Sequence, residues 1–182
     1  SLAMRGLVLA GSQATYSIAT ASFPAPVELR SGTAIQQRFT TASLGSILSI
    51  RGTYRLGSRN DGGQWNGAGR VESLGVVEIA PTEPASAGSE ATWNLPVSIR
   101  PGGTLRLLPN AFLNLSCSAQ SLNLAGALDL QAGSRLRVDA CNRKPFVITA
   151  TATVAGSGQL RFDSSDLVLE RDFKTEEHTS EL

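Results

Sequence analysis

Five short stretches along the chain share one pattern: glycine, any residue, an apolar residue, any residue, an apolar residue. Alternation at every second position places apolar side chains on one face of a β-strand and polar side chains on the other. Successive glycines are 23 to 32 residues apart. The pattern therefore predicts short strands with one buried face, and these strands lie in GTYRL (52–56), GVVEI (75–79), GTLRL (103–107), GALDL (126–130) and GQLRF (158–162).

A second apolar pair follows three of these stretches, and it begins 9 or 10 residues after the glycine. The residues between the two pairs, such as LPNA (108–111) and QAGS (131–134), are typical of tight corners. Repetition with a period of roughly 20 to 30 residues indicates that each unit forms one turn of a coil and stacks on its predecessor. We therefore expect an all-β chain folded as a single-stranded parallel β-helix, or β-solenoid, with irregular corner loops. The second pairs are Leu113 and Leu115, Leu136 and Val138, and Leu167 and Leu169.

An antiparallel β-sandwich is the alternative, because it also consists of short strands separated by turns. The coils are expected over residues 41–170. Residues 1–40 are expected to form an N-terminal segment and candidate cap, since SFPAPVELRSG (22–32) is interrupted by proline and fits no repeat unit. Residues 171–182 are charged and lack periodicity, which predicts a disordered tail.

Two cysteines, Cys117 and Cys141, follow corresponding strands by nearly the same number of residues. Equivalent positions on neighbouring coils lie ~4.8 Å apart, and a disulfide accepts a Cα separation of ~4.4 to 6.8 Å. We therefore predict a Cys117–Cys141 disulfide, which implies an oxidising and extracellular setting. The alternative is two free thiols buried in the core. Asn114 begins an N-glycosylation sequon and lies at an outward position between two leucines, so it is a candidate glycosylation site.

Charge and chemistry exclude several classes of function. The formal net charge is +1, which gives no electrostatic reason to expect a nucleic-acid partner, and no apolar run approaches the ~18 residues of a membrane span. His178 is the only histidine and lies in the predicted tail, so neither a catalytic triad nor a metal site built on several histidines is expected. We predict no catalytic residue, no metal and no cofactor.

Four stretches carry a resemblance to a known family: WNGAGRVESLGVVEIAP (65–81), RPGGTLRLLPNAFLNLS (100–116), LAGALDLQAGSRLRV (124–138) and TVAGSGQLRF (153–162). They resemble the repeats of secreted, adhesin-like β-solenoid proteins over about residues 40–170. The resemblance implies a surface-exposed or secreted rod used for display, adhesion or spacing. The paired cysteines depart from it, because many bacterial members largely lack cysteine.

Carboxylates offer the one route to catalysis, because many parallel β-helices are polysaccharide lyases or hydrolases. Asp129 and Asp163 are candidates for such a site and for ligand contacts, although glycoside hydrolysis needs two carboxyl groups at a defined separation. The simpler interpretation is a solvated surface, in which stacking places Arg106 beside Asp129 as an exposed ion pair. Trp65 and Trp93 are candidate sugar-stacking residues if exposed, and core residues if buried.

The expected function is a non-catalytic structural or adhesive module, extracellular or at the cell surface. Its loops, including 58–68 and 81–90, would present a surface to a glycan or protein partner. A carbohydrate-active enzyme is the alternative, and self-association through terminal coils is a weaker one. The last residues, Ser180 and Leu182, resemble a C-terminal ligand of a PDZ domain.

Overall fold

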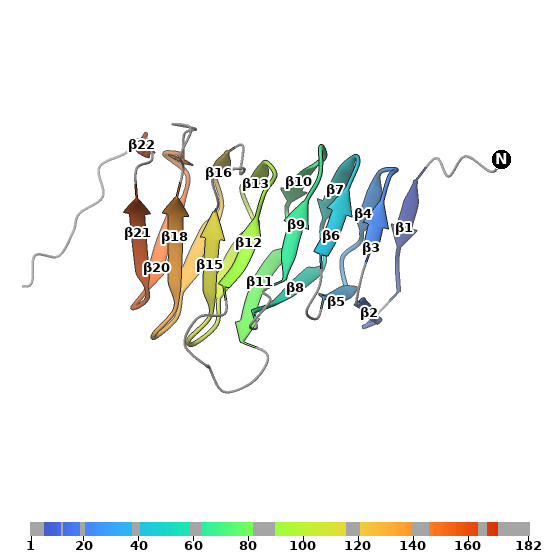
Figure 1. The fold of residues 1–182 in the computed structure, drawn as a ribbon, viewed down its shortest axis with the longest axis horizontal. Helices are drawn as coiled ribbons and strands as arrows, with labels where there is room; N and C mark the ends of the chain where they lie inside the picture. The colour runs from blue at the N-terminus through green and yellow to red at the C-terminus, as the bar shows by residue number, and fades with distance from the viewer. Residues whose placement is uncertain are drawn as a thin grey trace, which may run out of the picture.

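The computed structural model describes residues 6–11, 13–18, 21–37, 41–58, 63–81, 90–115, 121–139, 146–163 and 167–170. These residues form 22 strands and no helix. The strands make three sheets of eight, seven and seven strands, stacked along one long axis (Figure 1). The chain therefore has the all-β architecture that the alternating pattern predicts.

Consecutive strands visit the three sheets in turn, so each group of three strands is one coil. Sheet A contains β1 (Leu7–Leu9), β4 (Val27–Leu29), β7 (Ile47–Ile50), β10 (Arg70–Ser73), β13 (Val97–Ile99), β16 (Leu122–Leu124), β19 (Phe146–Ile148) and β22 (Leu167–Leu169). Sheet B contains β2 (Thr15–Ile18), β5 (Ala34–Gln37), β8 (Thr53–Ser58), β11 (Val76–Pro81), β14 (Thr104–Leu107), β17 (Ala127–Leu130) and β20 (Thr153–Gly156). Sheet C contains β3 (Ala21–Phe23), β6 (Thr41–Leu44), β9 (Gln64–Asn66), β12 (Glu90–Trp93), β15 (Phe112–Leu115), β18 (Arg135–Asp139) and β21 (Gln159–Asp163).

Every strand pair among the described residues is parallel. Parallel neighbours need a crossover between them, and here the other two strands of each coil provide it. The structure is therefore a parallel β-solenoid, and the antiparallel sandwich is excluded.

The repeat is assigned correctly for four of the five glycine stretches. Those at 52–56, 75–79, 103–107 and 126–130 form β8, β11, β14 and β17, which are neighbours in sheet B. The fifth, GQLRF, forms β21 in sheet C, and the apolar pair after it forms β22 in sheet A. Strand β20, with the sequence TVAG, takes the sheet B position in that coil. Alternation is the same in all three sheets, so it does not identify the sheet to which a strand belongs.

The N-terminal segment is not separate from the coils. Strands β1 to β5 lie within residues 6–37 and continue all three sheets. The proline-containing stretch forms a sheet A strand and the corner after it, and this pattern recurs, since Pro-Val-x-apolar-Arg-x-Gly occurs at 26–32 and again at 96–102. Gly32 and Gly102 end these corners with φ angles of 79° and 86°, a conformation that suits glycine in a tight turn. The predicted tail at 171–182 lies outside the described residues.

Close contact between coils explains the repeated glycine. A Cβ atom added to Gly75 would overlap the backbone oxygen of Gly52, and one added to Gly126 would overlap that of Gly103. The same oxygens accept hydrogen bonds from the next residues, at 2.9 Å from Val76 N and 2.9 Å from Ala127 N. Each repeat glycine therefore allows one coil to rest directly on the backbone of the coil before it.

The apolar faces of the three sheets enclose one continuous core. Its centre is an aromatic stack in which the rings of Trp65 and Trp93 lie 4.9 Å apart and nearly parallel. Tyr54 meets Trp65 edge to face, with ring centroids 5.1 Å apart. The Tyr54 hydroxyl donates a hydrogen bond of 2.6 Å to Oε1 of Gln37, and burial raises the pKa of this tyrosine. The Tyr54 hydroxyl is therefore satisfied by a neighbouring coil, whereas Nε1 of Trp65 and Nε1 of Trp93 are enclosed without a hydrogen-bond partner among the described residues.

Candidate functional surface

The outer face of sheet B carries a ladder of opposite charges. Arg55, Glu78, Arg106 and Asp129 occupy the same position on four consecutive strands. Nε of Arg55 lies 2.5 Å from Oε1 of Glu78, and Nε of Arg106 lies 2.9 Å from Oδ2 of Asp129. Arg106 also approaches Glu78, with 3.9 Å between NH1 and Oε2. This confirms the predicted pairing of Arg106 with Asp129 and extends it over four coils.

Glu78 is the most enclosed member of this ladder, because its side chain is only 8% exposed. A carboxylate removed from water is costly unless it is paired. The two arginines on either side supply that pairing.

Sheet C carries a second cluster, centred on Asp163. Its carboxylate accepts hydrogen bonds from Nε of Arg161 at 2.9 Å and from Nε of Arg137 at 2.8 Å. These hydrogen bonds, that from Arg161 first, hold the pKa of Asp163 below its usual value. A general acid needs the opposite shift. Asp129 lies on sheet B and Asp163 on sheet C, so the two candidate carboxylates occupy different faces.

Sheet A carries a third cluster, centred on Glu72. Nε of Arg70 lies 3.0 Å from Oε1 of Glu72, and NH2 of Arg100 lies 3.2 Å from Oε2. The hydrogen bond from Arg70 is the main reason that the pKa of Glu72 lies below its usual value, and Arg100 adds to it. Each of the three outer faces therefore has a carboxylate paired with arginines from its own or neighbouring strands.

The two tryptophans cannot serve as sugar-stacking residues. Trp65 and Trp93 are both 0% exposed, and each ring is stacked on the other inside the core. They belong to β9 and β12, where the alternation of QWN and of EATW directs them inward. Their placement is the core alternative, and their candidate role in ligand contact is wrong.

Asn114 lies on the outer side of β15, between the buried Leu113 and Leu115. The neighbouring strands place Thr92 and Arg137 beside it. Its side chain is half-buried, and Oδ1 is enclosed without a hydrogen-bond partner in the described part of the chain. The predicted outward direction is confirmed, and the residue is less accessible than an isolated surface asparagine.

Several predicted features lie outside the described residues. They are Cys117, Cys141, Ser180, Leu182, residues 59–62 of the first expected loop and residues 82–89 of the second. Residues 64–66, expected in the loop 58–68, form strand β9 instead. The strands that precede the two cysteines, β15 and β18, are hydrogen-bonded neighbours, with Leu115 opposite Val138. The disulfide stays a prediction that this neighbour relation favours.

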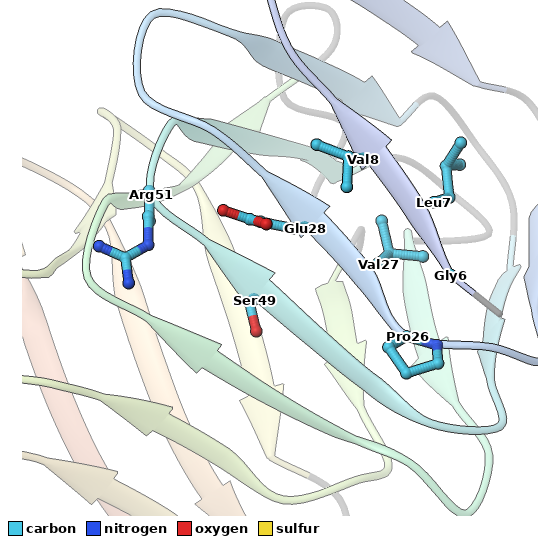
Figure 2. A pocket seen from close by; sticks show the side chains of 8 residues that line it. All are labelled: Gly6, Leu7, Val8, Pro26, Val27, Glu28, Ser49 and Arg51. Carbon is cyan, nitrogen blue, oxygen red and sulfur yellow. The ribbon is translucent and has the colours of Figure 1, made fainter.

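A shallow hollow of about 410 Å³ lies on the outer face of sheet A, where β1, β4 and β7 are adjacent (Figure 2). Val8 and Pro26 provide apolar surface, and Glu28, Ser49 and Arg51 provide polar groups. Glu28 already has an arginine partner, because Nε of Arg30 lies 3.6 Å from its Oε1. The hollow can accept a small amphipathic group. Glu28 is the one carboxylate among its lining residues, so the hollow lacks the pair of carboxyl groups that glycoside hydrolysis needs. The described residues contain no cluster of three side chains suited to a metal ion.

The charge ladder on sheet B was missed as a whole by sequence reasoning, although its signal is present. Aligning four of the repeat stretches on their glycines places Arg55, Glu78, Arg106 and Asp129 in one column with alternating sign. The residues of the clusters on sheets A and C do not lie at a constant distance from a repeated glycine, so the same alignment does not reveal them.

Comparison with known proteins gives no relative: no family model matches the chain, and neither the curated proteins nor the solved structures contain a significant match. No helix that could span a membrane occurs in the described residues. The class defined by the fold is therefore the parallel β-solenoid, and its function rests on the surface described above.

Proposed function

We propose that the chain is a non-catalytic structural module that presents rigid β-solenoid faces to a partner outside the cell or at its surface. The observation that carries the proposal is the ladder Arg55–Glu78–Arg106–Asp129, which runs over four coils of a flat sheet. Fixed charges on a rigid sheet are suited to recognition, because little conformational entropy is lost when a partner binds.

A protein partner fits this face better than a neutral glycan does. Sugar rings are held by exposed aromatic faces, and both tryptophans lie in the core. Alternating charges instead complement a partner surface with the reverse pattern and thereby give specificity. The extracellular location rests on the resemblance to adhesin-like repeats and on the predicted disulfide.

The chemistry of the described carboxylates also favours a non-catalytic role. Asp163 has a lowered pKa because of two arginines, whereas a glycosidase acid needs a raised one. Arg106 and Asp129 are already paired with each other at 2.9 Å. A substrate would have to displace these arginines before either carboxylate could act.

The test is incubation with polygalacturonate, heparin and xylan, in which retention of each polysaccharide and product formation are scored in the same wells. The charge-reversed variants R106D and D129R, and the double variant that combines them, are compared with the wild type to test the ladder. Retention without products, lost in R106D and not restored in the double variant, would support recognition by this face, because the swap restores the ion pair but not the order of charges that a partner contacts. Restoration in the double variant would show that the pair acts through stability alone. Release of shortened or unsaturated products would overturn the non-catalytic assignment.

A further inference from the structure

Core side chains are less buried in the first and last coils of the solenoid than in its middle. Five large hydrophobic side chains of the described residues are exposed, and four of them belong to the first or the last coil: Val8, Val154, Val168 and Leu169. The core residues that are only partly buried are also confined to these coils, and they are Leu7, Leu9, Phe23, Leu160 and Phe162. The core side chains are therefore enclosed in the middle coils and only partly buried in the first and last described coils.

Val154 and Leu169 lie in core positions, whereas Val168 and Val8 lie on the outer face, opposite Val147 and Glu28. Val154 is opposite the buried Leu128, and Leu169 is opposite the buried Ile148. A further coil stacked on β20, β21 and β22 would bury them, as each coil buries the one before it. Strands β1 and β22 lie at opposite ends of the rod (Figure 1).

The edge strands of sheet A at the two ends have the same sequence. Strand β1 is Leu7–Leu9 and strand β22 is Leu167–Leu169, and both read LVL. Stacking one on the other in parallel would place leucine on leucine and valine on valine. Such matched apolar pairs are the contacts that stabilise adjacent strands.

The free backbone groups of the two edges are complementary. Leu7 N donates to Pro26 O at 2.9 Å, and Leu9 O accepts from Arg30 N at 3.0 Å, so both residues face β4. Backbone groups of consecutive strand residues point to opposite sides, which leaves the N–H and C=O of Val8 on the open edge. At the other end Glu170 N donates to Ile148 O at 3.0 Å, which leaves the groups of Leu169 open.

The register between β1 and β4 also shows how these groups would meet. Leu7 is opposite Val27, and its N–H donates to the carbonyl of Pro26, the residue that precedes Val27. Each residue that faces the next coil therefore donates to the residue before its opposite number. With Leu169 opposite Leu9 of a second copy, the same rule directs Leu169 N–H to Val8 C=O. The ladder of sheet A would then pass from one molecule to the next without a change of geometry.

We propose that the chain associates end to end, with the first coil of one copy stacked on the last coil of another. This contact uses different surfaces on the two partners, so each dimer keeps one free end of each kind and can extend into a linear filament. The proposal goes beyond the recognition of a partner by the outer faces, which it leaves accessible.

Three lysine variants of the full chain test it, each at a side chain exposed to a similar extent. They are V8K at the first coil, L169K at the last coil, and L74K in the middle as the control, with 50%, 46% and 47% exposure. Sedimentation velocity over a concentration series should show self-association of the wild type and of L74K with a Kd below about 1 mM. V8K and L169K should each weaken association at least about tenfold, because an edge lysine opposes strand pairing.

Mixing the two end variants distinguishes the proposed contact from others. V8K keeps a free last coil and L169K keeps a free first coil, so an equimolar mixture should form dimers and nothing larger. Dimers of V8K alone would indicate pairing of two last coils and would overturn the head-to-tail contact. A monomeric wild type at all concentrations, or an equal effect of L74K, would overturn the proposal as a whole. If L169K shifts the urea midpoint, V168K at 41% exposure takes its place.

Discussion

Arg106 and Asp129 occupy equivalent positions on consecutive coils, and Nε of the arginine lies 2.9 Å from Oδ2 of the aspartate. Two coils earlier Arg55 and Glu78 make the same kind of contact at 2.5 Å, with a glutamate that is far less exposed. The two pairs share an arginine–carboxylate contact and a sheet, and their main difference is burial, so comparing them tests its contribution.

Double-mutant cycles on the two pairs should therefore give different coupling energies. The Arg106–Asp129 pair is partly exposed, and its coupling should be at most about 1 kcal/mol. Replacing Arg55 by alanine leaves an enclosed carboxylate with only the more distant Arg106, and its cost should reach about 1–3 kcal/mol. Urea unfolding of the single and double alanine variants measures both values, and equal couplings would contradict the role of burial.

Replacing a repeat glycine should disrupt the contact between coils. Gly75→Ala places a Cβ against the backbone oxygen of Gly52, and backbone cannot move aside as a side chain can, so we expect a loss of about 2–3 kcal/mol or more. Gly102→Ala is the control, because its Cβ would meet nothing within 4 Å and would suffer only from the positive φ of 86°. That strain should cost about 1–2 kcal/mol. A larger loss in Gly102→Ala would show that turn conformation, and not coil contact, requires the glycine.

Acid should remove the contribution of Glu72 to stability. Its pKa is lowered in the folded state from an ordinary value of 4.5 by Arg70 and Arg100, so its contribution is present above about pH 4.5 and is lost as the pH falls through the folded pKa. The wild type should exceed Glu72→Gln in stability at pH 7, by up to about 1 kcal/mol. The urea midpoints of the two should converge once the pH lies below the folded pKa of Glu72. A difference that persisted in acid would mean that the carboxylate acts through packing.

The predicted Cys117–Cys141 disulfide should be detectable by mass spectrometry of a non-reduced digest. Its removal in a Cys117→Ser, Cys141→Ser variant should cost on the order of 3 kcal/mol, because the unfolded chain is no longer closed into a loop. The same loss should occur when the wild type is unfolded under reducing conditions. Two alkylatable thiols in the oxidised protein would contradict the bridge and the oxidising location inferred from it.

Alternation and repeat spacing were sufficient to predict the solenoid and the neighbour relation of Arg106 and Asp129. Both follow from local rules, since period-two alternation sets the faces and the repeat sets the stacking. The inward direction of Trp93 was also available, because it lies two residues after Ala91 in a strand whose intervening residue is polar. The repeat glycines were a reliable marker of the coils, because close stacking of one coil on the next requires a residue without a side chain at that position.

The sequence did not predict to which of the three sheets a given strand belongs. GQLRF has the same pattern as the sheet B strands but lies in sheet C, because the TVAG strand before it is too poor in large apolar residues to be recognised. The first coils were missed for a related reason, since Thr33 takes the position before the sheet B strand that the repeat glycine holds in the next coils. The clusters around Glu72 and Asp163 depend on which strands become neighbours, and local patterning does not report this.

The sign of the charge in the sheet B ladder alternates from coil to coil, in the order Arg55, Glu78, Arg106, Asp129. Excision of the single coil that carries Glu78 would bring two guanidinium groups together, whereas excision of two adjacent coils would leave every arginine beside a carboxylate. Removal of one inner coil of the ladder thus carries an electrostatic penalty that removal of both inner coils avoids. The alternating charges therefore tie the stability of this face to the number of coils between Arg55 and Asp129.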